Sequence, residues 1–302
     1  MSKRKQDAKN ADSEDEASDV SHIDVDFDFF DLNPTVDYQA IKRLLVQLFH
    51  RDAEAFDLHD LTELILAQPL GTTTKTDGMD SDPYALLTMI NMHTNHERPA
   101  IKSLAAYLLS KAAQIQPKLH STLQILFSQS ETHVGLVICE RLVNMPVQII
   151  PPMYRMLLDE LRNALSVGKP YKFSHLIFLS RTYHLSNDEE SELAAHRSQN
   201  SPTAKSKKSK KAKTGAAQAQ VGEEYDLMKK RPEDGIYPFH PEDLLIMQLA
   251  EYLMDYKFDK APEGPREKES FGLDTRGRVM LLRAEKFEEL VKKMTQVYNG
   301  LS

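Results

Sequence analysis

A few residues have the chemistry that a catalytic or metal site would need, but their spacing does not support one. Cys139 is the single cysteine and ends an apolar run, where a small buried hydrophobic residue is a plainer interpretation than a nucleophile. His93 and His96 lie three residues apart, but no cysteine pair or third histidine lies at zinc-binding spacing. Glu140 and Arg141, which follow Cys139, are interpreted as an ion pair or a strand-end contact rather than as a catalytic acid. We therefore predict no catalytic residue, no metal site and no enzymatic activity.

Phosphate-binding glycine loops are also missing from the sequence. Such a loop needs glycines because its backbone amides must approach the ligand without obstruction by side chains. The 11 glycines are scattered over 302 residues and form neither GxGxxG nor GxxxxGKS or GxxxxGKT. ATP, GTP and dinucleotide chemistry are disfavoured, and we predict no cofactor.

A lysine run is the strongest compositional feature of the chain. Nuclear import receptors bind a dense basic cluster of this kind in extended form, and the alternatives are a solubilising linker or a phosphate-binding segment. The run holds no arginine and no aromatic residue, which makes nucleic acid an unlikely partner because base stacking would use them. We predict a nuclear import signal formed by Lys205, Lys207, Lys208, Lys210, Lys211 and Lys213.

The N-terminal segment carries the opposite charge. Residues 11–31 include nine acids and no lysine or arginine. Such a segment repels itself and cannot pack until apolar residues enter, at Val25, Phe27 and Phe29, so the tail is expected to end near residue 22. We predict an electrostatic shield for a basic client, with a merely solubilising tail as the alternative. The residues of the shield are Asp12, Glu14, Asp15, Glu16 and Asp19.

Composition bounds the class of protein. With 41% apolar and 27% charged residues, a packed core is possible, and collagen-like, fully disordered and disulfide-rich classes are excluded. A single cysteine fits a reducing compartment, and no apolar run reaches the roughly 18 residues needed to span a bilayer. The net charge of −7 argues against a generic nucleic-acid binder. We expect a cytosolic or nuclear protein with no direct membrane contact.

Segments with strand and helix patterns alternate along the chain and position these residues. Strands are predicted where acids alternate with aromatic residues over 25–29, as a short strand within 72–82, and in the apolar runs 84–92, 134–139, 173–179 and 279–282. Helical spacing predicts helices over 41–49, 58–65, 101–109, 119–127, 151–165 and 287–294, and 244–258 fits either type. The fold class is therefore α/β (α+β), a sheet covered by helices.

The domain organisation follows from where the apolar pattern stops. A chain of 302 residues allows one large domain or two ordinary ones. The apolar pattern collapses over about 187–234, which contains the lysine run, so this stretch is expected to be a low-complexity insertion. We predict a disordered acidic tail over 1–22 and a single α/β domain over 23–302, interrupted by a disordered lysine-rich insertion at about 187–234.

One stretch resembles a family signature. It reads GLVICERLVNMPVQIIPP and is similar to the pattern of the BCCIP family, which includes the fungal Bcp-type proteins. The acidic tail, the FDFFD strand at 27–31, the lysine-rich insertion and the terminal VMLLRAEKFEELVKKM agree, so the resemblance covers about residues 22–302. We expect a structural or partner-contact role for the matching residues, Gly135, Glu140, Arg141, Asn144, Pro146 and Gln148.

The resemblance implies a mixed curved sheet flanked by helices, similar to the acetyltransferase superfamily fold. In that superfamily a strand leads through an R/Q-x-x-G-x-G/A loop to a helix, and the loop amides hold the coenzyme A pyrophosphate. The junction expected to match is 92–101, which has no glycine and contains Pro99, a residue without an amide hydrogen. We therefore expect no coenzyme A loop, and a scaffold that recognises protein.

The resemblance also implies a function. Fungal members are nuclear chaperones and export factors whose clients include a large-subunit ribosomal protein of the bacterial L-fourteen type and a phosphatidylinositol phosphate kinase. Animal members are linked to recombination factors and a cyclin-dependent kinase inhibitor. We expect a non-enzymatic nuclear chaperone that shuttles to the cytoplasm, binds a basic ribosomal protein and nuclear transport receptors, and supports large-subunit biogenesis. The alternatives are a degenerate acetyltransferase and a genome-maintenance adaptor.

Overall fold

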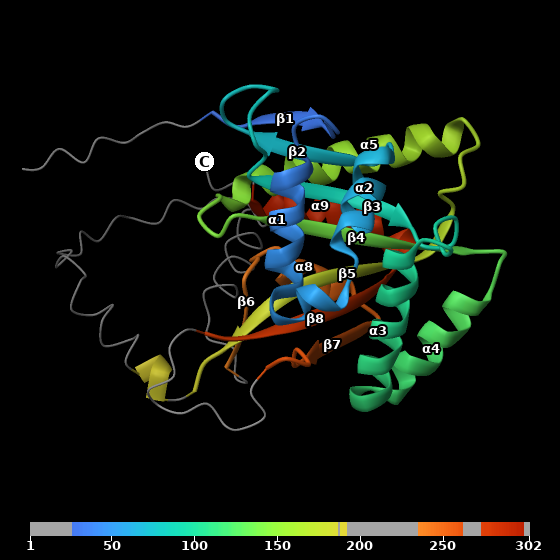
Figure 1. The fold of residues 1–302 in the computed structure, drawn as a ribbon, viewed down its shortest axis with the longest axis vertical. Helices are drawn as coiled ribbons and strands as arrows, with labels where there is room; N and C mark the ends of the chain where they lie inside the picture. Colours follow the sequence, from blue (N-terminus) through green and yellow to red (C-terminus); the bar gives the residue numbers. More distant parts are fainter. Residues whose placement is uncertain (1–25, 187, 192–234, 262–272, 299–302) are drawn as a thin grey trace, which may run out of the picture.

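An open mixed sheet of eight strands forms the centre of the molecule (Figure 1). The computed structural model describes residues 26–186, 188–191, 235–261 and 273–298. The strand order is β1-β2-β3-β4-β5-β8-β7, and β6 pairs with β5 beyond the end of β4. The strands are β1 (Asp28–Asp31), β2 (Gly71–Lys75), β3 (Ala85–Asn91), β4 (His133–Arg141), β5 (Phe173–His184), β6 (Ile236–Pro238), β7 (Tyr252–Tyr256) and β8 (Asp274–Arg283).

Helices cover both faces of the sheet and give the molecule two cores. One face is covered by α1 (Tyr38–Phe49), α2 (Leu58–Ala67), α3 (Pro99–Ile115) and α4 (Pro117–Ser128). The other is covered by α5 (Ile150–Ser166), α8 (Asp243–Leu249) and α9 (Phe287–Tyr298). Short 3-10 turns occur at His50–Ala55, Val147–Ile149 and Ala284–Lys286. No helix in the described ranges has the length and apolarity to cross a membrane.

Local patterns explain why the helices form where they do. The buried side chains of α1 include Ile41, Leu44, Leu45 and Leu48, which recur at helical spacing and so form one apolar stripe. Both α3 and α4 begin at a proline, whose fixed φ and missing amide hydrogen are tolerated in the first turn. The prediction of a mixed α/β fold with helices on a sheet is confirmed.

Several element boundaries differ from the prediction. The β1 strand begins at residue 28 rather than 25, and β5 and β8 are longer than their apolar runs because they pair with each other from His175 to His184. The ambiguous segment 244–258 contains both elements. Its first part is α8, which packs Leu245 and Ile246 into the core, and its second part is β7, which pairs with β8. The three-residue β6 was not predicted at all.

Two strand-to-helix junctions follow strands at the centre of the sheet. All neighbouring strands are antiparallel except β4 and β5, and α5 lies between these two in sequence as their crossover helix. Ligands of α/β sheets bind outside the carboxyl ends of strands, and residues 142–149 form the junction that follows β4 of the parallel pair. The strand-to-helix junction predicted at 92–101 is also present, because residues 92–98 link β3 to α3, and Asn91 Oδ1 accepts there from the amides of His93 (2.9 Å) and Thr94 (3.2 Å).

Candidate functional site

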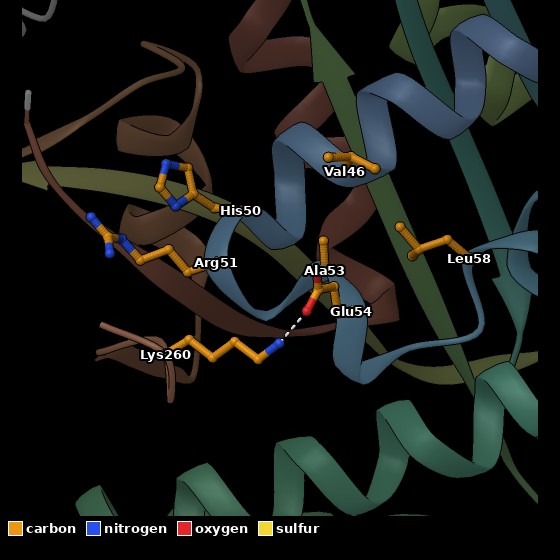
Figure 2. Close-up of a pocket in the computed structure, with 7 residues that line it drawn as sticks. All are labelled: Val46, His50, Arg51, Ala53, Glu54, Leu58 and Lys260. Carbon is orange, nitrogen blue, oxygen red and sulfur yellow. Dashed lines mark hydrogen bonds and ion pairs between the residues drawn. The ribbon is translucent and has the colours of Figure 1, made fainter. Parts of the chain in front are cut away.

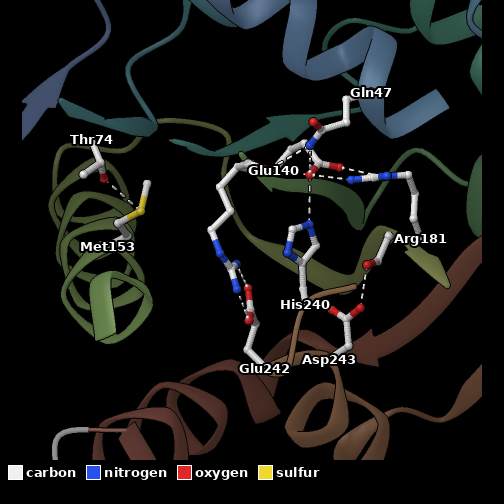
Figure 3. Close-up of polar contacts among 10 residues, drawn as sticks. Gln47, Thr74, Glu140, Met153, Arg181, His240, Glu242 and Asp243 are labelled. Atoms are coloured by element: carbon white, nitrogen blue, oxygen red, sulfur yellow. Dashed lines mark hydrogen bonds and ion pairs between the residues drawn. The ribbon is translucent and has the colours of Figure 1, made fainter. Parts of the chain in front are cut away.

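The carboxyl ends of β4 and β5 form the candidate functional site, and a later segment of this chain fills it (Figure 3). The β4 strand pairs with β5 as far as Leu179, and β6 takes its place from Thr182. The chain after β6 then passes across the ends of both strands before α8 begins. A crevice that holds a ligand in other α/β sheets is therefore occupied here by residues 239–243.

Glu140 is the centre of the site. It is the penultimate residue of β4, and its side chain is fully buried. Its carboxylate accepts hydrogen bonds from Arg181 of β5 (3.1 and 3.2 Å) and from Gln47 Nε2 of α1 (2.8 Å). Nε2 of His240 lies 2.9 Å from Glu140 Oε1. One carboxylate thus joins β4 to β5, to α1 and to the segment that follows β6.

Arg141 forms the second connection to that segment. Its guanidinium is buried and donates to both oxygens of Glu242, with 2.9 Å between Nη2 and Oε2. A bidentate pair of this kind fixes direction as well as distance. Next to it, Ser180 donates to Asp243, and the ring of Phe239 lies 4.5 Å from the Arg181 guanidinium carbon.

The charges of the site balance one another. Burial by itself raises the pKa of Glu140, but His240 and Arg181 outweigh it and hold that pKa at about 2. Burial likewise lowers the pKa of His240, and the carboxylates of Glu140 and Glu242 outweigh it and leave the pKa raised. Burial also opposes the charged forms of Glu242 and Arg141, yet their pairing lowers the pKa of Glu242 and raises that of Arg141. The site is a set of mutually neutralised ion pairs.

Asp243 differs from the other acids of the site. Burial and the neighbouring Glu242 raise its pKa to about 6, against the opposing effects of His240 and of the hydrogen bond from Ser180. Its carboxyl group therefore gains a proton near pH 6, where the side chains of Glu140 and Glu242 are still charged.

The side chains considered for catalysis have structural surroundings. Desolvation raises the pKa of the Cys139 thiol, which opposes formation of a thiolate. His93 accepts from the Val134 amide at Nδ1 (3.0 Å), and its Nε2 lies 3.1 Å from the Leu126 carbonyl oxygen. His96 is largely exposed and faces Glu97 at 2.9 Å. In the described part of the chain, no group of three acids, histidines or cysteines could hold a metal.

A second depression lies on the surface between α1 and the turn at residue 260 (Figure 2). It is lined by Val46 of α1, by His50 and Arg51 of the following 3-10 turn, and by Lys260, which is paired with Glu54. Burial and the nearby arginines lower the pKa of His50. The depression therefore holds one imidazole of lowered pKa and the exposed Lys260–Glu54 ion pair.

The six motif residues divide into buried and exposed members. Gly135 lies where a Cβ would be 2.7 Å from Leu176 Cδ2, so a larger residue would clash with β5. Glu140 and Arg141 belong to the buried ion pairs, and Pro146 precedes the Val147–Ile149 turn. Asn144 and Gln148 are exposed, and neither makes a side-chain hydrogen bond to another described residue. Beside them, Leu142 and Val143 are 38% and 73% exposed.

The chain is similar in sequence to several known proteins. The family model BCCIP matches residues 22–246, which include the motif and the residues that fill the site. Protein bcp1 of Schizosaccharomyces pombe is 40% identical over 287 residues, covering 93% of each chain. Protein bcp1 of Aspergillus fumigatus is 38% identical, over 94% of this chain and 90% of its own.

The chain belongs to the BCCIP family. A crystal structure of BCP1 from Saccharomyces cerevisiae has a similar fold, with a TM-score of 0.58 and 22% identity over 96% of this chain and 98% of that chain.

The partners of the BCCIP-family motif were not predicted from the sequence. Arg181, His240 and Glu242 follow the motif by about 40 to 100 residues, and no local periodicity connects them to it. One signal was available, since charged residues directly after a buried run, as in the ERL of the motif, require buried partners. That signal does not identify which residues are the partners.

Two sets of predicted site residues lie outside the described part of the chain. The lysine run and the acidic shield both fall within ranges whose structure is not described. The described residues by themselves hold 29 acids and 22 lysines and arginines, so they carry the whole formal charge of −7. The N-terminal acidic region, residues 26–98, contains 13 of the acids and five of the bases.

Proposed function

We propose that this BCCIP-family chain is a non-enzymatic nuclear chaperone and transport adaptor that binds a basic large-subunit ribosomal protein. The observation that carries the proposal is the concentration of negative charge in the N-terminal acidic region, where acids exceed bases by eight. A free ribosomal protein is basic, and a surface of opposite charge attracts it and shields it from nucleic acid. The client would then be released during large-subunit assembly.

The occupied site at the ends of β4 and β5 supports a role without catalysis. Residues 239–243 fill the position where a substrate would bind, and the buried side chains there are committed to one another. We also propose that the sheet is a variant of the acetyltransferase superfamily fold. Its junction at 142–149 has no glycine and contains Pro146, which leaves no row of free amides for a pyrophosphate.

Transport is the second part of the proposal. The lysine run would bind nuclear import receptors, and the adaptor would shuttle to the cytoplasm with its client, including a phosphatidylinositol phosphate kinase. The two ends of the insertion that contains the run are held close together, because the amide of Leu185 donates to the carbonyl of Gly235 (3.0 Å) and β6 pairs with the end of β5. An import signal placed there would be accessible without unfolding the sheet.

Calorimetric titration of the full chain with a purified basic large-subunit ribosomal protein, over a salt series, tests the proposal. We expect submicromolar binding that weakens steeply as salt rises, because opposite charges drive association. Absence of binding at low salt would overturn the proposed function. Heat on titration with coenzyme A alone would instead support the degenerate acetyltransferase, and DNA binding that is lost on deleting residues 204–214 would support the genome-maintenance adaptor.

A matched pair of variants distinguishes the effect of the N-terminal acidic region on binding from the effect of the net charge of the chain. The variant E63Q/D80N removes two exposed acids from the N-terminal acidic region, and E131Q/E285Q removes two exposed acids elsewhere. None of the four side chains makes a hydrogen bond to another described residue, so folding should not change. We expect affinity for the ribosomal protein to fall about threefold to tenfold in the first variant and less than twofold in the second.

A further inference from the structure

The β1 strand forms one edge of the sheet. It pairs with β2 on one side, from Asp28 opposite Lys75 to Asp31 opposite Thr72, and no other described strand pairs with its second side. Phe27 and Phe29 pack against the core on the α5 face, which holds the strand in place. An edge of this kind offers a row of backbone donors and acceptors to another extended chain.

The hydrogen-bond pattern shows which groups face outward. The Leu70 carbonyl accepts from the Met89 amide (3.3 Å), which sets the alternation of bonds between β2 and β3. Successive residues of an antiparallel strand direct their backbone groups to opposite neighbours, so the residues of β2 that do not bond to β3 bond to β1. Phe30 lies opposite one of these residues, so its backbone N–H and C=O groups face β2. Phe29 and Asp31 therefore direct their backbone N–H and C=O groups to the open edge.

The charge at this edge has one sign. Lys75 is the basic residue paired with β1, but its ammonium group is fully buried against Asp37 (2.6 Å) and the carbonyl of Met79 (2.7 Å). On the α5 face Glu160 accepts from the Gly71 amide (3.0 Å), and burial, together with the nearby Asp31, raises the pKa of Glu160 to about 7. The exposed acids are Asp26, Asp28 and Asp31 on and beside the strand and Asp77 and Asp80 in the turn after β2.

We propose that the open edge of β1 binds an extended lysine- and arginine-rich segment of the client as an added strand. The inference rests on the proposed function, because it assigns the place where a basic client is held. Charged side chains on an edge strand prevent most other strands from pairing with it. The charges on β1 are negative, so a basic strand is attracted to this edge rather than repelled. Backbone pairing with the outward groups of Phe29 and Asp31 supplies the binding mode, and the acids supply the selectivity.

Two synthetic peptides test the edge directly. The probe is acetyl-Lys-Val-Lys-Val-Lys-Val-amide, and its control has the same sequence with alternate backbone nitrogens methylated, which keeps the charge but prevents strand pairing. We expect the probe to bind the full chain at least tenfold more tightly than the control. We also expect the probe alone to slow hydrogen exchange at the amides of Phe29 and Asp31. Equal binding of the two peptides, or no slowing at these amides, would overturn the proposal.

A matched pair of variants tests the same point from the protein side. Asp31→Pro removes the carboxylate and the outward N–H, whereas Asp31→Ala removes the carboxylate alone, and a proline is tolerated where the N–H of an edge strand faces solvent. We expect Asp31→Pro to bind the probe at least fivefold more weakly than Asp31→Ala. If Asp31→Pro changes the thermal unfolding of the chain, the methylated peptide with the unaltered chain decides the question.

The edge and the proposed function can fail separately. If the ribosomal protein binds the unaltered chain and the Asp31→Pro variant equally well, the edge proposal is wrong and the proposed function stands. If the ribosomal protein does not bind at all while the probe discriminates as expected, the proposed function is wrong and the edge stands as a site for basic extended segments.

Discussion

The substitution Arg141→Ala removes one half of a buried ion pair and tests what the motif does. Arg141 and Glu242 are 3% and 1% exposed, and the guanidinium contacts both carboxylate oxygens. Without Arg141, the carboxylate of Glu242 remains in the interior next to Asp243 with no bidentate partner. Breaking a buried pair in this way costs about 3–5 kcal/mol of unfolding free energy. For a chain of this size we expect the melting temperature to fall by about 6–20 °C.

The pH dependence of this loss has a defined sign. In the unaltered protein the pKa of Glu242 is lowered, so the contribution of the pair is present above the ordinary value of 4.5 and is lost as pH falls through the folded value. In the variant, the buried carboxyl group of Glu242 lacks its arginine partner and takes up a proton more readily, and the penalty disappears once it is neutral. The difference in stability should therefore be largest at neutral pH and smaller near pH 5.

The test is to measure thermal and urea unfolding of the unaltered protein, of Arg141→Ala and of a control variant. The control is R141M/E242L, which removes both charges at similar volume and is expected to lie within about 2 kcal/mol of the unaltered protein. Hydrogen exchange should accelerate in residues 236–249 in Arg141→Ala and remain slow in the control. An Arg141→Ala variant that melts within 2 °C of the unaltered protein but no longer binds the ribosomal protein would refute the structural role.

Three further predictions concern other parts of the chain. In His240→Gln the side chain cannot gain a proton, so the loss of unfolding free energy relative to the unaltered chain should be largest below pH 6.5 and should shrink as pH rises. The reason is that the pKa of His240 is raised, so its contribution to stability disappears when it loses its proton. A pH-independent difference in urea unfolding would contradict this. Deleting residues 1–22 should slow association with the ribosomal protein severalfold in stopped flow and flatten its salt dependence, and an unchanged rate would leave the folded part as the sole binding element. A fluorescent fusion should move to the cytoplasm on alanine substitution of the central lysines, whereas a persistent nuclear signal would transfer the import role to other basic residues. These lysines are Lys207, Lys208, Lys210 and Lys211.

Helical and strand elements with a continuous local pattern were predictable. The stripe of α1 and the apolar run of β4 are properties of neighbouring residues, so they can be identified before any tertiary contact is known. The segment 244–258 could not be assigned to a helix or a strand in this way, because its apolar residues fit both the helical and the strand period. The core contact of α8 and the pairing of β7 with β8 decided where one element ends and the other begins.

The sequence alone determined the family, through residues 135–148, and the charge pattern from which the proposed function starts. The tertiary structure decided what the motif residues contact, because the partners of Glu140 and Arg141 come from α1, from β5 and from a segment about 100 residues later. It also decided which strands lie at the edges of the sheet, β1 among them, since strand order depends on long-range pairing and not on local pattern. Periodicity indicates whether a side chain faces a core, whereas the contribution of a buried charge to stability depends on the group that the fold places beside it.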